Sequence, residues 1–90
     1  MDAPPSHLDG ARVLRYVISR RGGFRESRGE AVFALAICRY DGSKDVYLFD
    51  CASDWEVIGD APWDSVDEAM QIALQHAMGE TLAWTIVPSD

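Results

Sequence analysis

Apolar and polar residues alternate along several short stretches of the chain, which is the pattern of β-strands that bury one face. The alternation is clearest in residues 31–40, AVFALAICRY, where Phe33, Leu35 and Ile37 share one face and small residues occupy the other. We expect the helix described below to pack on the small-residue face, where there is room for it. Strands of this kind are predicted at residues 11–20, 31–40, 46–51, 55–58 and 82–87.

A different periodicity lies between Ser65 and Gly79, where apolar residues recur at three- and four-residue steps as in an amphipathic helix. Ser65 and Glu68 match a capping box, in which the Ser65 hydroxyl accepts from the Glu68 N–H and the Glu68 side chain accepts from the Ser65 N–H. Gly79 is expected to end the helix in a left-handed conformation. The predicted apolar stripe consists of Val66, Ala69, Met70, Ala73, Ala77 and Met78, widened by Ile72 and Leu74.

The order of these elements predicts an α+β fold with a four- to five-stranded, mainly antiparallel sheet and one α-helix packed on one face (β-β-β-β-α-β). The break at Gly59–Pro62 is expected to end the fourth strand, because proline cannot continue a ladder. The last strand either returns beside the first or lies parallel to the fourth through a right-handed crossover. Residues 11–88 are predicted to form a single domain, and residues 1–10 a flexible N-terminal tail.

Charge is distributed unevenly along the chain. All eight basic residues lie in residues 1–44, which carry a net charge of +3, whereas residues 45–90 contain ten acids and no base, so that the whole chain carries −7. Either the two halves neutralise each other in the fold, or the second half offers an anionic face to a basic partner. The overall sign argues against non-specific binding of nucleic acid.

Composition excludes several classes of protein. The apolar content is that of a folded globular domain, and no apolar run is long enough to cross a membrane. The first residues lack the basic and apolar regions of a secretory signal. Cys38 and Cys51 are interpreted as reduced, buried thiols. We therefore expect a cytoplasmic protein.

No arrangement of residues is typical of catalysis or of a metal centre. His7 and His76 lie in no catalytic signature. Asp50, Asp54, Asp60 and Asp64 would form at most a weak divalent-cation site, and acids in turns more commonly cap and solubilise. The sequence therefore predicts no enzyme, no cofactor and no metal.

Two surfaces are candidates for binding. Trp63 lies just before the predicted helix cap and either forms an exposed aromatic anchor among acids or folds over the helix start. The glycine-rich basic loop at residues 21–30 fits no phosphate-binding motif, and its Phe24 either contacts a ligand or folds back onto the core. The predicted partner-binding residues are Asp54, Asp60, Trp63, Asp64 and Asp67, and the alternative anion-contact loop consists of Arg21, Phe24, Arg25 and Arg28.

The segment YLFDCASDWEVIGDAPWDSVDEAM, residues 47–70, resembles a pattern of small uncharacterised bacterial proteins, in which a Tyr-Leu-Phe-acidic-Cys hairpin precedes a helix that opens with Ser-x-x-Glu-Ala. This resemblance implies a fold and a bacterial source but no activity. A looser similarity is to the HicB-like antitoxin domain, although the chain lacks the glycine-rich connection before the helix and any appended helix-turn-helix. The matching residues are Tyr47, Leu48, Phe49, Asp50, Cys51, Trp55, Val57, Trp63, Ser65, Glu68 and Ala69.

Two functions remain open from the sequence. The first is a non-catalytic protein-interaction module whose acidic face binds a basic partner, in the manner of antitoxins or immunity proteins. The second is a homodimeric small-ligand-binding or regulatory domain that holds an anionic ligand. The sheet face away from the helix is expected to be partly bare, and if it carries Leu14, Phe33 or Tyr47 it would serve as a dimer or partner surface.

Overall fold

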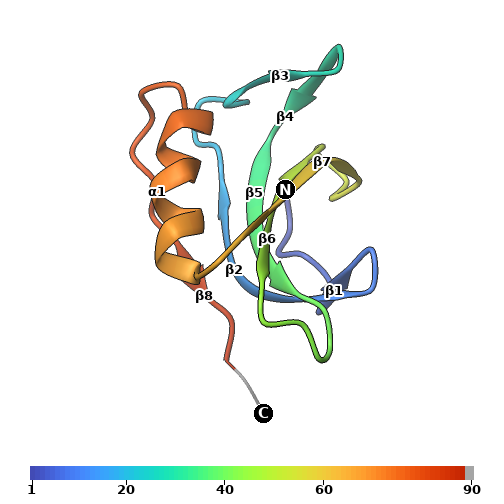
Figure 1. Cartoon of the computed structure of the whole chain (residues 1–90). Helices are drawn as coiled ribbons and strands as arrows, with labels where there is room; N and C mark the ends of the chain where they lie inside the picture. The colour runs from blue at the N-terminus through green and yellow to red at the C-terminus, as the bar shows by residue number, and fades with distance from the viewer. Residues whose placement is uncertain (89–90) are drawn as a thin grey trace.

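The computed structural model describes residues 1–88. It has the predicted α+β fold, a mainly antiparallel sheet with one helix along one side (Figure 1). The elements are β1 (His7–Leu8), β2 (Ala11–Ile18), β3 (Arg25–Ser27), β4 (Glu30–Val32), β5 (Ala34–Arg39), β6 (Val46–Cys51), β7 (Val57–Trp63), α1 (Val66–His76) and β8 (Thr85–Ile86).

Within residues 1–88 the main sheet has six strands in the order β1-β2-β5-β6-β7, with β8 pairing with β2, and every pairing is antiparallel. The last strand thus lies beside the long first one, the first of the two placements considered above. β3 and β4 form a separate hairpin that projects beyond one end of the sheet (Figure 1). Arg28 and Gly29 at its tip both have positive φ, 53° and 80°, as a two-residue type I′ turn requires.

The strand β7 extends through Pro62, so the prediction that this strand stops at Ile58 is wrong. Pro62 pairs in register with Tyr47 of β6. Among the described residues β7 has β6 as its only neighbour in the sheet, and a proline on an edge strand needs no donor on its outer side. The connection expected between Gly59 and Asp64 is therefore mostly regular strand.

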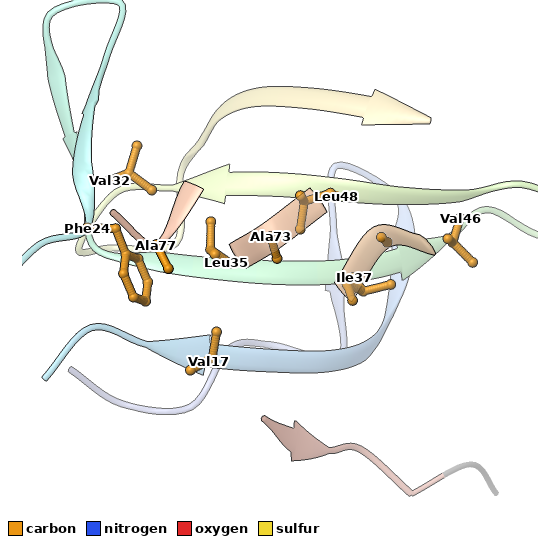
Figure 2. Close-up of a cluster of buried hydrophobic side chains, with 10 residues drawn as sticks. Val17, Phe24, Val32, Leu35, Ile37, Val46, Leu48, Ala73 and Ala77 are labelled. Atoms are coloured by element: carbon orange, nitrogen blue, oxygen red, sulfur yellow. The ribbon is translucent and has the colours of Figure 1, made fainter. Parts of the chain in front are cut away.

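The helix packs on the face of β5 that carries its larger side chains. Leu35 and Ile37 of β5 lie in one buried cluster with the helix residues Ala73 and Ala77, as Figure 2 shows. The prediction that α1 would cover the small-residue face of β5 is wrong, because the small residues that allow close approach belong to the helix itself.

The opposite face is covered by the N-terminal segment and Trp55. The Trp55 indole Nε1 donates to the Asp2 carbonyl (2.9 Å), and its ring meets the Tyr16 ring edge-on at a centroid distance of 5.7 Å. The Val13 amide donates to the Ser6 carbonyl (2.9 Å), and Leu8 is buried. The segment predicted as a tail thus contains β1 and contacts the sheet, and the face expected to be partly bare is covered.

The helix begins and ends close to the predicted residues. The Ser65 hydroxyl accepts from the Glu68 amide (3.1 Å), but the Glu68 carboxylate accepts from the Asp64 amide (3.0 Å) instead of the Ser65 amide. The residues after the helix, Met78 and Gly79, both have positive φ. Leu74 and Met78 are 56% and 61% exposed, so the buried stripe is narrower than predicted. Within residues 1–88, no helix combines the length and the apolar character needed to cross a membrane.

Candidate functional site

A buried carboxylate links three separate elements of the fold. Asp50 follows Val46 and Leu48 on the helix-facing side of β6, and it is only 4% exposed. Its Oδ2 accepts from Arg25 Nη2 of β3 at 2.6 Å, and its Oδ1 accepts from His76 Nδ1 of α1 at 2.9 Å. We call Arg25, Asp50 and His76 the Asp50 cluster. It holds the β3–β4 hairpin and the end of α1 against the sheet.

The electrostatics of the cluster favour an ionised Asp50. Burial by itself raises the pKa of this carboxyl, but the hydrogen bonds from His76 and Arg25, together with their charges, lower it, and the net pKa lies below the ordinary value of 3.8. An ionised carboxylate can only accept hydrogen bonds, so His76 carries its proton on Nδ1. Arg25 Nε is buried without a hydrogen-bond partner in residues 1–88.

A carboxylate that orients a histidine is also part of catalytic triads, which need in addition a nucleophile within reach of the imidazole. In the described part of the chain, the hydrogen-bond partner of His76 is Asp50, and Arg25 Nη2, itself a donor, lies 3.3 Å from Nδ1. Both thiols are free and lie in the cluster on the other face of the sheet. Burial raises the pKa of Cys38 to about 12 and also raises the pKa of Cys51, which keeps both thiols protonated. The geometry supports a structural role for the cluster.

The Asp50 cluster was missed by the sequence prediction, although the sequence contains a signal for it. The alternation of β6 places Asp50 on the same face as Val46 and Leu48, where an unpaired carboxylate would be costly. Such a position requires a donor from another element. Because the donors lie 25 residues before it and 26 residues after it, the sequence alone does not identify them.

The predicted partner-binding residues do not form one cluster. Asp54 lies in the turn before β7, whereas Asp64 and Asp67 lie at the start of α1, beyond the other end of this seven-residue strand, roughly 20 Å away. Asp60 pairs with Phe49 on the sheet face away from the helix, and Trp63 pairs with Val46 on the helix face. Within residues 1–88, no three metal-ligating side chains come together.

Trp63 lies on the helix-facing side of the sheet. The residue is partly buried and packs against the helix-side core. Its Nε1 is buried without a hydrogen-bond partner among residues 1–88. Its main contribution is therefore packing.

The residues of the predicted anion-contact loop have mostly intramolecular roles. Phe24 is 3% exposed in the helix-side core. Arg21 pairs with Glu80 (Nε to Oε1, 3.3 Å) and donates to the Ala77 carbonyl, and Arg25 pairs with Asp50. Arg28, at the hairpin tip, is exposed and makes no ion pair with residues 1–88.

No protein-family model, curated protein or solved structure matches the chain. The resemblances drawn from residues 47–70 therefore stay predictions.

Proposed function

We propose that the protein is a non-catalytic interaction module that binds a basic partner protein along an acidic edge of its sheet. The observation that carries this proposal is a run of carboxylates in residues 54–68, a segment without a single base. All of these carboxylates are exposed, and none forms an ion pair with a residue in 1–88. We define the acidic edge by these six residues, which are Asp54, Glu56, Asp60, Asp64, Asp67 and Glu68.

The acids that do form ion pairs lie elsewhere. Asp50 and Glu80 are paired with Arg25 and Arg21, so the basic half of the chain neutralises two acids of the second half and leaves the acidic edge uncompensated. Unpaired charges of one sign repel each other within the folded protein. A partner with complementary charge relieves this repulsion and is also steered toward the edge, which raises the association rate.

The backbone of the acidic edge is poorly suited to pairing with another strand, so a partner is expected to contact its side chains. Pro62 in the middle of the acidic edge lacks an N–H, so an added strand would lose a donor there. Acidic side chains and a proline on an edge strand also oppose pairing with a second copy of the same edge. The expected partner therefore presents arginine or lysine side chains in a row. A small acidic protein of this kind would mask a basic surface as antitoxins and immunity proteins do.

The test compares two triple variants with the same change in net charge. Asp60→Asn/Asp64→Asn/Asp67→Asn removes three charges from the acidic edge, and Asp2→Asn/Asp9→Asn/Asp41→Asn removes three exposed charges elsewhere. Each protein is immobilised, and proteins captured from a lysate of the source cells at low and high salt are identified by mass spectrometry.

We expect the wild type and the second variant to retain a basic protein that high salt releases, and the first variant to lose it. Circular dichroism checks that both variants are folded. Equal capture by both variants, or a partner that high salt does not release, would contradict the proposal.

A further inference from the structure

Two arginines face each other across neighbouring strands without a negative partner. Arg12 of β2 is in register with Arg39 of β5. Arg39 lies two residues after Ile37, whose side chain faces the helix, so alternation places Arg39 on the same face. Neither guanidinium forms an ion pair or a hydrogen bond with a residue in 1–88, in contrast to Arg21 and Arg25. Like charges at directly opposite positions of an antiparallel pair are destabilising.

The two arginines line one pocket. Its volume is about 330 Å³, and a neighbouring hollow of about 350 Å³ shares Arg12 and Asp41 with it. The acidic edge runs from the turn before β7, along β7, to the start of α1, and β6 separates β7 from β5 in the sheet. The lining residues of the first pocket are Arg12, Leu14, Arg39, Tyr40, Asp41 and Gly42.

We infer that this pocket binds the oxyanion of a small molecule, a phosphate or carboxylate group, between Arg12 and Arg39. A guanidinium presents a planar set of donors that matches either group with two parallel hydrogen bonds. An anion between the two side chains would also remove their mutual repulsion. The inference concerns a small-molecule site and is independent of the protein partner proposed for the acidic edge.

The surrounding charges limit which anion fits. Asp41 also lines the pocket, so the three charged side chains together carry one positive charge. The whole chain is acidic, and it offers little long-range attraction to an anion. Affinity therefore depends on short hydrogen bonds from the two guanidiniums, and a singly charged group is favoured over a doubly charged one. Leu14 provides an apolar wall for the rest of the ligand.

The test is a titration followed by the backbone amide signals of Tyr40, Asp41 and Gly42 in ¹H–¹⁵N NMR spectra. The probes are phenyl phosphate and benzoate, with sodium chloride at equal ionic strength as the reference. We expect at least one probe to give saturable shifts at these amides. A preference for one probe assigns the oxyanion, and the absence of saturable shifts with both would overturn the inference.

Substitutions then identify the donors. Arg12→Gln and Arg39→Gln should each weaken binding by about tenfold or more, because each removes charge-assisted hydrogen bonds. Arg28→Gln is the matched control, since it removes one exposed guanidinium far from the pocket in sequence, and it should leave affinity unchanged. The same spectra show whether each variant is folded. Unchanged affinity in a folded Arg12→Gln or Arg39→Gln variant, or an equal loss in Arg28→Gln, would rule the site out.

Discussion

Asp50 places a charge on the apolar, helix-facing side of β6. Moving a carboxylate out of water is costly, and its attraction to Arg25 and its hydrogen bond from His76 offset that cost only while both donors are present. Asp50 therefore stabilises the fold only while Arg25 and His76 are both present. Removing Arg25 or His76 leaves the buried carboxylate without one of its two donors.

Acid should weaken the protein through this residue. The folded-state pKa of Asp50 is below 3.8, so the unfolded chain takes up the proton first as pH falls. The stabilisation is complete above the unfolded value and is lost as pH falls through the lower folded value. Urea unfolding between pH 2 and pH 7 should show this as a falling free energy of unfolding below about pH 4.

Glu80 also has a lowered pKa in the folded state, because hydrogen bonds from Arg20 and Ser19 outweigh its partial burial. The variant Asp50→Asn separates the contribution of Asp50 from that of Glu80. At pH 7 the variant should lose about 3 kcal/mol of unfolding free energy. The difference from the wild type should shrink as the pH is lowered. A constant difference across the whole pH range would show that Asp50 does not titrate as described.

At the scale of the elements, α1 contacts the sheet through alanines. Ala69, Ala73 and Ala77 are fully buried, and their small side chains fit against Leu35, Ile37 and Leu48. Close packing of this kind leaves no room for a larger side chain. The outer side of the helix has no such limit, since Leu74 is mostly exposed.

Enlarging the buried side of the helix should therefore destabilise the protein. Ala73→Leu is expected to lower the free energy of unfolding by about 1–3 kcal/mol, because the added atoms overfill the core. Leu74→Ala, a change of opposite size at the next position, should change it by about 0.5 kcal/mol or less. Thermal and urea unfolding of both variants measure the two effects. A larger loss for Leu74→Ala would mean that the helix faces the other way.

Local patterns predicted the longer elements because these elements obey local rules. Neighbours in sequence determine the alternation of β2, β5 and β6, and they also determine the cap at Ser65. The extension of β7 through Pro62 depends on its position at the edge of the sheet, which is a tertiary property. β1 has only two residues and offers no periodicity.

The candidate sites were likewise predictable only where their residues are close in sequence. The acidic edge follows from composition, because its residues are close in sequence. The Asp50 cluster and the pocket at Arg12 and Arg39 depend on strand register and on which face the helix covers. Both faces of β5 are apolar, so its alternation did not decide which one would meet α1.

At the scale of the whole molecule, the N-terminal segment completes the second buried face. Trp55 is 8% exposed although its backbone is left-handed (φ 68°), a conformation that costs a bulky residue roughly 1–2 kcal/mol. Burial of its large side chain and the hydrogen bond to the Asp2 carbonyl offset this strain. The sequence holds no local signal for this arrangement.

Deleting residues 1–6 should lower the melting temperature and shift tryptophan emission to longer wavelength. The deletion removes the acceptors of the Trp55 indole and the Val13 amide, at a cost of about 1–3 kcal/mol. In a Trp55→Phe background the emission shift should disappear. Asp2→Ala is the control, because it keeps the backbone carbonyl and should leave both measurements unchanged. An unaltered melting temperature after the deletion would contradict this role of the segment.

The pairing of β2 with β8 also constrains when the protein can fold during its synthesis. Arg15 and Tyr16 pair with Ile86 and Thr85, so β2 cannot complete its pairing until β8 has been made. Contacts between distant parts of a chain form slowly, because a long loop must close before they stabilise anything. The helix-facing sides of β2 and β5 stay uncovered until α1, which follows both strands in the chain, has been made. Chaperones that bind exposed apolar strands should therefore contact the nascent chain before α1 has emerged from the ribosome.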